Sequence, residues 1–313
     1  MKIILPTPEN ALKIGTRGSP LALAQAHETR ARLAAAFDLP FEAFTIVVIK
    51  TTGDRVIDRP LKEIGGKGLF TKEIEEAMLS GDIDIAVHSM KDMPVAQPAG
   101  LLLDTYLPRE DVRDAFVSLS HDGIADLAEG ATVGTSSLRR RAQLLARRPD
   151  LNIVEFRGNV QTRLQKLENG VATATFLAMA GLIRLRADDV RRFAVDTDDM
   201  LPAVAQGAIG IERRANDMRA AEMLAAIHDD VTGQRLAAER AFLTALDGSC
   251  ETPIGGLAEI SGGSLRLRGE ILRPDGSEVI ADDQTCTIAD GADLGRAMAA
   301  TMLAQAGPGF LQV

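Results

Sequence analysis

At 313 residues the chain is longer than one hydrophobic core usually organises, so its length predicts two or three domains. The net charge of −9 disfavours a general affinity for nucleic acid or an anionic membrane, and the absence of Trp beside a single Tyr removes the aromatic platforms on which bases stack. The two cysteines, Cys250 and Cys286, are too few for a disulfide scaffold or a cysteine-rich metal site.

The N-terminal end of the chain carries no pattern of an export signal. Residues 1–10 lack an apolar core between a basic start and a small-residue cleavage site. The longest apolar runs, such as 172–183, are too short to span a bilayer. We therefore expect a cytoplasmic, or at least non-exported, protein.

Strand-like and helix-like segments alternate over the first hundred residues. A short strand at 11–15 precedes a helix at 21–37, which Ser19 is expected to cap with Pro20 at its first position. The next expected elements are a buried strand at 44–50, a glycine-rich loop at 65–68, a helix at 70–79 and a strand at 82–88. Alternation of this kind predicts an α/β domain with a mixed, largely parallel sheet.

A second α/β set follows the charged stretch 109–114. Its expected strands lie at 115–119, 132–134 and 153–156, and its helices begin near Ser136 and Asn159. From residue 257 onward the chain changes to short strands with hairpin turns at 261–263 and 274–276, followed by one helix at about 294–305. We expect a small third domain of the α+β type there, and we find no convincing internal repeat.

Polar side chains follow the strand at 82–88. Residues 87–94 read Val-His-Ser-Met-Lys-Asp-Met-Pro, and ligands of open α/β sheets bind at the carboxyl ends of strands. The carboxylate of Asp92 could accept hydrogen bonds from N–H donors there and stabilise a developing cation. The alternative is a polar turn that merely ends the strand. A single histidine such as His88 is more often structural than catalytic.

Positive charge is concentrated between residues 136 and 166, where eight basic residues stand against two acidic ones, for a local net charge of +6. The hydroxyls at 135–137 can cap a helix whose free N–H groups favour anions, and arginine adds a planar fork that binds a carboxylate through two bonds. Arg157 and Arg163 repeat this pattern at another strand-to-helix turn. Single arginines are more often solvated, and their grouping leaves a solvated surface and a binding site equally open. As a binding site, the cluster fits a small polyanion better than DNA. Exposed helix charges are expected at Arg141, Arg147 and Arg148.

Two loops carry further candidate residues. The glycine-rich loop lacks the order of a nucleotide-binding P-loop because Gly68 follows Lys67, and a mobile lid carrying Lys67 is expected instead. Cys250 lies in the small-residue loop 248–253, which is compatible with a covalent role, although an inert thiol fits the sequence equally well. Cys286, in a strand-like segment, is expected to serve packing.

Together these motifs resemble the porphobilinogen deaminase family from about residue 14 to residue 260. The matching stretches, in order and in spacing, are 16–22, 65–70, 87–94, 133–140, 157–160, 201–212 and 248–255. The resemblance implies an α/β fold with two periplasmic-binding-protein-like α/β domains around a cleft, plus a small α+β C-terminal domain. The implied boundaries are 1–107 with 208–225 for the first domain, 113–201 for the second and 230–313 for the third.

The resemblance also implies the activity of hydroxymethylbilane synthase, a transferase of tetrapyrrole (heme) biosynthesis. Such an enzyme condenses four porphobilinogen molecules, with loss of ammonia, onto a dipyrromethane cofactor held by a thioether bond, and then releases linear 1-hydroxymethylbilane by hydrolysis. No metal, nucleic acid or membrane is implied, and a monomer is the family expectation.

The resemblance assigns a role to individual residues of this chain. Catalysis is assigned to Asp92. The residues implied in cofactor binding are Cys250, Lys91, Ser89, Thr135, Ser136, Ser137, Arg139, Arg140, Arg163 and Arg184. Those implied in substrate binding are Arg17, Ser19, Arg157, Gln206 and Lys67.

Two residues depart from the family pattern, and one rival interpretation remains open. Glu63 stands where many relatives have a lysine, and Ala205 replaces a common glycine before Gln206. A non-catalytic, two-lobed anion-binding protein would explain the arginines without giving a task to Asp92 or Cys250.

Overall fold

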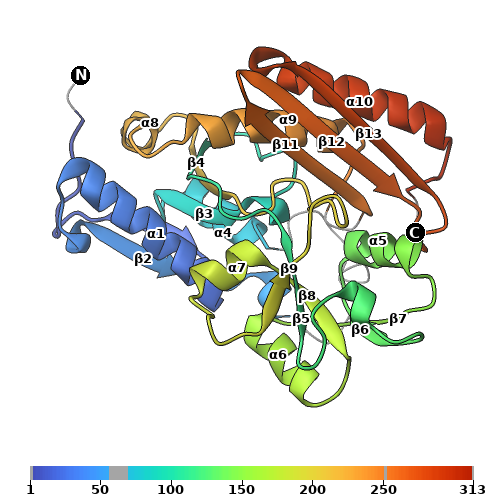
Figure 1. The fold of residues 1–313 in the computed structure, drawn as a ribbon. Coiled ribbons are helices and arrows are strands. Elements are labelled where there is room, and N and C mark those ends of the chain that lie inside the picture. Colours follow the sequence, from blue (N-terminus) through green and yellow to red (C-terminus); the bar gives the residue numbers. More distant parts are fainter. Residues whose placement is uncertain (1–2, 56–69, 250–251, 312–313) are drawn as a thin grey trace. The chain divides into compact units, whose positions relative to one another are not determined.

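The structure is a computed structural model that describes residues 3–55, 70–249 and 252–311 (Figure 1). The chain forms two compact units, one of Met1–Arg109 with Ala208–Gly233 and the other of Glu110–Gly207 with Gln234–Val313. Among the helices described, none has both the length and the apolar character that a membrane crossing requires.

The first unit is built on one five-stranded sheet in the order β2-β1-β3-β10-β4. Its strands are β1 (Leu12–Thr16), β2 (Phe44–Val48), β3 (Ile85–Ser89), β4 (Leu101–Tyr106) and β10 (Ile209–Arg214). Strand β1 is parallel to β2 and β3, whereas β10 is antiparallel to β3 and β4. The helices are α1 (Pro20–Phe37), α2 (Thr52–Arg55), α4 (Lys72–Ser80) and α8 (Met218–Ala225), with 3-10 turns at Phe41–Ala43 and Met90–Asp92.

The two faces of this sheet have separate cores. Side chains alternate along a strand, so Val87 of β3 joins the cluster that contains Ala26 of α1, whereas its neighbour Ala86 joins Ile74 and Met78 of α4. Helix α1 therefore packs on one face of β3 and α4 on the other.

The second unit contains another five-stranded sheet, in the order β7-β6-β8-β5-β9. Its strands are β5 (Asp114–Ser118), β6 (Thr132–Gly134), β7 (Asn152–Val154), β8 (Ala174–Ala178) and β9 (Arg192–Ala194). The helices that follow these strands are α5 (Leu138–Arg147), α6 (Val160–Glu168) and α7 (Met179–Arg184), with a 3-10 turn at Ile124–Asp126. At its core Phe116 and Phe176 meet edge to face, with ring centroids 5.6 Å apart.

The two five-stranded sheets share one arrangement. In each, the second strand in the order (β1 or β6) lies parallel to both neighbours, and the fourth strand (β10 or β5) is antiparallel to the strands on either side. Strand β10 follows the whole second sheet in sequence but completes the first. The first sheet is therefore assembled from two distant parts of the chain.

The C-terminal part of the second unit is a three-stranded antiparallel sheet with two long helices (Figure 1). Its elements are α9 (Asp230–Ala245), β11 (Ile254–Ser261), β12 (Ser264–Leu272), β13 (Val279–Thr287), a 3-10 turn (Ile288–Asp290) and α10 (Gly291–Ala306). A Cβ at Gly295 would lie 2.4 Å from the carbonyl oxygen of Ala238. The glycine thus allows α10 to lie directly on α9.

This architecture confirms the predicted fold class, with two α/β sheets and a small α+β C-terminal part. The strand expected at 11–15 and the helix expected at 21–37 are β1 and α1. Ser19 caps α1 as expected, since its hydroxyl accepts a hydrogen bond from the N–H of Ala22 at 3.3 Å. The expected domain boundaries remain a prediction.

Candidate active site

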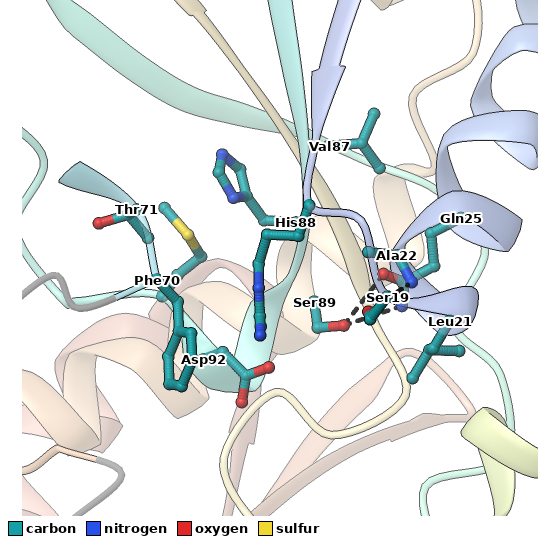
Figure 2. A pocket seen from close by; sticks show the side chains of 12 residues that line it. Ser19, Leu21, Ala22, Gln25, Phe70, Thr71, Val87, His88, Ser89 and Asp92 are labelled. Atoms are coloured by element: carbon teal, nitrogen blue, oxygen red, sulfur yellow. Dashed lines mark hydrogen bonds between the residues drawn. The ribbon is translucent and has the colours of Figure 1, made fainter. Parts of the chain in front are cut away.

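A pocket lies at the carboxyl end of β3 in the first unit (Figure 2). Strands β1 and β3 are parallel neighbours, so the segments that follow them meet at one edge of the sheet. Arg17 and Ser19, which follow β1, and Ser89 and Asp92, from the end of β3 and the turn after it, line the pocket together. The structure therefore brings together four residues that the sequence analysis singled out at separate positions.

Ser89 is held by a residue that the sequence analysis missed. The Gln25 amide donates to the Ser89 hydroxyl at 2.9 Å, and this hydroxyl in turn donates to the amide oxygen of Gln25 at 3.0 Å (Figure 2). Gln25 belongs to α1 and is 3% exposed. Its position offered a signal, because Gln25 lies on the same helical face as Ala26, Thr29 and Leu33, which is the buried face of α1.

Asp92 ends the 3-10 turn that follows β3 and is exposed. Figure 2 shows its side chain beside Phe70, on the side of the pocket away from Gln25. Arg17 stacks on the Phe70 ring, with its guanidinium carbon 4.1 Å from the ring centroid. Lys91, between the buried Met90 and Asp92, is half-buried. The pocket thus combines a carboxylate with a guanidinium group.

The hydroxyl side chains before α5 are engaged with the backbone of the second unit. Ser137 caps α5, accepting from the N–H of Arg140 at 3.4 Å, and Thr135 accepts from the N–H of Ser137 at 3.2 Å. Ser136 accepts from the N–H of Phe156 at 3.0 Å. The first two contacts lie in the predicted turn between β6 and α5, and the third ties this turn to the segment that follows β7.

Arg139 and Arg140 are buried, at 4% and 5% exposure, and both form ion pairs with Asp114. The nitrogen–oxygen distances are 2.8 Å for Arg139 and 2.7 Å for Arg140. Burial would raise the pKa of the Asp114 carboxyl, but the two guanidinium groups hold it well below its usual range. Gln206 also donates to Asp114, at 3.0 Å. The buried Asp114 is thus a shared counterion that the sequence analysis missed.

The remaining arginines are half-buried at helix ends of the second unit. Arg157 and Arg163 flank the start of α6, where Arg163 donates to the carbonyl oxygen of Gly158 at 2.9 Å. Arg184 ends α7 and donates to the carbonyl oxygen of Gly207, next to Gln206, at 3.0 Å. Arg141 and Arg147 are exposed as expected.

The prediction was wrong for one of the three expected surface charges. Arg148 is half-buried, because its guanidinium bonds to Asp150 at 2.7 Å and to the carbonyl oxygens of Ile124 and Leu127 at 3.1 Å.

Three residues from the sequence analysis, Cys250, Lys67 and Glu63, lie outside the described residues. The described ends of the Cys250 loop are tied together, since Ser249 and Thr252 exchange hydrogen bonds of 2.9 and 2.7 Å. Cys286, expected in packing, is half-buried on β13. Across the described ranges no cluster of His, Cys, Asp and Glu could hold a metal ion.

Comparison with known proteins identifies the family of the chain. The family model for the "Porphobilinogen deaminase, dipyromethane cofactor binding domain" matches residues 12–222, and that for the "Porphobilinogen deaminase, C-terminal domain" matches residues 234–304. The porphobilinogen deaminase of Paracoccus denitrificans is 68% identical over 98% of both chains. The chain belongs to the porphobilinogen deaminase family. The chloroplastic porphobilinogen deaminase of Pisum sativum is 54% identical over 96% of this chain and 83% of its own.

Membership of the porphobilinogen deaminase family confirms the predicted enzyme class, a transferase of tetrapyrrole biosynthesis, and the predicted dipyrromethane cofactor.

Among solved structures, the VFT2 domain of Bordetella pertussis BvgS is similar to 74% of this chain at 16% identity, covering 92% of that domain, with a TM-score of 0.42. The extracellular-binding protein ytmK of Bacillus subtilis is similar to 73% of this chain at 15% identity, covering 96% of that protein, with a TM-score of 0.41.

Proposed function

We propose that this chain condenses four porphobilinogen molecules stepwise on its dipyrromethane cofactor and releases linear 1-hydroxymethylbilane by hydrolysis. The observation that carries this proposal is the place of Asp92. Among the described residues that line the pocket at the end of β3, Asp92 supplies the one carboxylate, and Arg17 stands in the same lining. A family member with this pocket has the charges that a dicarboxylate pyrrole requires.

Asp92 is proposed to act on the reacting pyrrole. Porphobilinogen becomes cationic as its aminomethyl group loses ammonia, and a carboxylate that accepts from the pyrrole N–H stabilises that cation. A new carbon–carbon bond then forms between this methylene carbon and the α-carbon of the terminal pyrrole, which loses a proton. The same aspartate serves all four condensations if the growing chain moves past it.

The arginines are proposed to bind the acetate and propionate groups that each porphobilinogen brings. Their charge offsets the repulsion between carboxylates that accumulate as the chain grows. Arg17, Ser19, Arg157, Gln206 and Lys67 would contact the substrate. In the structure, the place of Gln206 beside Asp114, and hence beside Arg140, supports a shared carboxylate-binding region in the second unit.

The donor chemistry of the described residues fits a dipyrromethane, whose side chains are carboxylates and whose ring nitrogens carry hydrogen. When bound through Cys250, this group would supply the nucleophilic pyrrole carbon for the first condensation. Besides the thiol, the residues that would hold it are Ser89, Lys91, Thr135, Ser136, Ser137, Arg139, Arg140, Arg163 and Arg184. The burial of Arg139 and Arg140 beside Asp114 supports rigid placement of their positive charge.

Three expectations complete the proposal. Porphobilinogen is the expected substrate, the chain is expected to act as a monomer, and its expected location is cytoplasmic. The domain boundaries are proposed at 1–107 with 208–225, at 113–201 and at 230–313.

The role of Asp92 is tested by Asp92→Asn. We expect the variant to fold like the wild type but to lose product formation from porphobilinogen by at least about 100-fold, since removal of one charge-stabilising group costs that order. Asp82→Asn, at an exposed turn of the same unit, is the matched control and should keep full activity. Near-normal turnover by Asp92→Asn would refute the catalytic assignment.

A further inference from the structure

Three titratable side chains gather on the face of the first sheet that packs against α4. Ser89 of β3 points to α1, where it bonds Gln25, so its neighbour His88 points to the opposite face. Glu212 of β10 stands opposite Ala86 of β3, which packs with α4, and therefore shares that face with His88. Glu75 of α4 completes the group, because its pKa responds to both His88 and Glu212.

His88 and Glu212 form a buried pair. Nε2 of His88 lies 3.2 Å from Oε2 of Glu212, and the two residues are 6% and 0% exposed. The other carboxylate oxygen of Glu212 has no hydrogen-bond partner among the described residues. A buried carboxylate is costly unless it is paired, so the imidazole is the principal compensation that the described structure offers to Glu212.

The charges of the pair also act on Glu75 in the first half of α4. Burial raises the pKa of Glu75, the Thr71 hydroxyl opposes the rise, and the neighbouring Glu212 adds to it. Thr71, directly before α4, lines the same pocket as His88 and Asp92. The buried group therefore reaches the pocket wall through His88, and its three residues belong to β3, β10 and α4.

The chain between His88 and Asp92 has little freedom to absorb a displacement. Met90 donates its N–H to the carbonyl oxygen of Ala208 at 3.0 Å, and its side chain occupies the space that a Cβ at Gly210 would fill, with Sδ 2.1 Å from that position. Gly210 is the register partner of His88. A shift of the imidazole would therefore be transmitted through one tight turn to Lys91 and Asp92.

We propose that His88 is a positioning residue for the condensation: the imidazole, held by Glu212, fixes the carboxyl end of β3 and thereby the place of the Asp92 carboxylate in the pocket. This inference rests on the proposed function, in which Asp92 stabilises the reacting cation. It assigns a task to a histidine that the sequence alone indicated to be structural. Small misplacements of a catalytic group cost up to about 100-fold in rate.

The test compares three variants of the full chain, each checked by intact mass for its cofactor and assayed with porphobilinogen. His88→Leu should lower kcat at least 10-fold with KM within 3-fold of wild type, because the pocket remains but Asp92 is displaced. His88→Gln, whose amide can still donate to Glu212, should recover most of the loss in kcat. Ile211→Val, a buried truncation on the opposite face of β10, is the control for lost stability and should keep the wild-type kcat.

A double variant separates positioning from stability. His88→Leu with Glu212→Met removes the buried carboxylate together with its partner, so thermal stability should rise above that of His88→Leu alone. Under the proposal kcat stays low in this stabilised variant; recovery of kcat together with stability would show a purely structural pair and overturn it. If His88→Leu does not fold, the kcat values of the double variant and of His88→Gln still test the positioning role of His88.

Two further results would contradict the proposal. A loaded His88→Leu with wild-type kcat would reject the role of His88 and leave the proposed function intact. A wild-type chain that forms no bilane from porphobilinogen would reject the proposed function and this role with it.

Discussion

Single residues in this structure show both what a sequence motif reveals and what it hides. Ser89 ends a strand, and Ser19 and Asp92 follow strands, so the convergence of these three residues could be predicted from the order of elements. Asp114 could not be found in this way, because the first residue of a strand gives no sign that two arginines more than twenty positions later will fold against it. Long-range pairing of this kind is fixed by the packed core and not by local pattern.

The departure at Ala205 has a conformational consequence. Ala205 is buried and has a left-handed backbone with φ of 62°, where a Cβ costs about 1–2 kcal/mol. Ala205→Gly relieves this strain but adds freedom to the unfolded chain. We expect a gain of about 0.5–1 kcal/mol in the free energy of unfolding, measured by denaturant titration.

Ala203→Gly is the matched control for this prediction, since Ala203 is not among the described residues with positive φ. It should lower the free energy of unfolding. A loss of stability in Ala205→Gly of the same size as in the control would show that the alanine is not strained.

Glu75 gives a prediction for pH dependence. Burial raises its pKa above the ordinary 4.5, so ionisation of Glu75 disfavours the folded state as the pH rises through the shifted pKa. Glu75→Gln should therefore be more stable than the wild type near pH 8, and this advantage should shrink as the pH falls through the shifted pKa and be lost near pH 4.5. Thermal unfolding across pH 4 to 8 measures it, and the exposed neighbour in Glu76→Gln should show no such trend.

Elements of secondary structure were predictable where a boundary signal coincides with a periodic pattern. Helix α1 has an N-cap serine, a proline at its first position and an apolar face, and it forms as expected. The strand β9 has three residues, and its pairing with β5 depends on the rest of the sheet. Its three residues carry too little pattern to be recognised before the fold is known, whereas the equally short β6 was expected at 132–134, directly before a predicted helix start.

The turn before α6 tests the carboxylate-binding role of the arginines at the element scale. Arg157 is half-buried, so Arg157→Leu is less confounded by lost packing than a change at the buried Arg140. We expect it to fold but to block cofactor assembly or stall elongation, measured by intact mass after incubation with porphobilinogen. Arg141→Leu removes an exposed charge and should elongate normally; equal behaviour of the two variants would reject the role of Arg157.

At the scale of the whole molecule, the two five-stranded sheets share one strand arrangement although the sequence shows no convincing repeat. Many different sequences can form sheets with the same strand order, so a shared order requires no repeat in the sequence. Local sequence pattern also could not show that β10 belongs to the first sheet, because its residues have the pattern of an ordinary strand. Only the resemblance to a family indicated that the chain returns to the first domain at about residue 208.

The central proposal involves residues from distant parts of the chain. Cys250, in the C-terminal part of the sequence, is proposed to carry the cofactor, and Asp92 of the first unit is proposed to stabilise the reacting cation. Intact mass spectrometry of the freshly purified protein tests it most directly. The account predicts a mass above that of the translated sequence by one two-pyrrole adduct, and loss of this excess in Cys250→Ser. A wild-type protein without added mass that still converts porphobilinogen to bilane would contradict it.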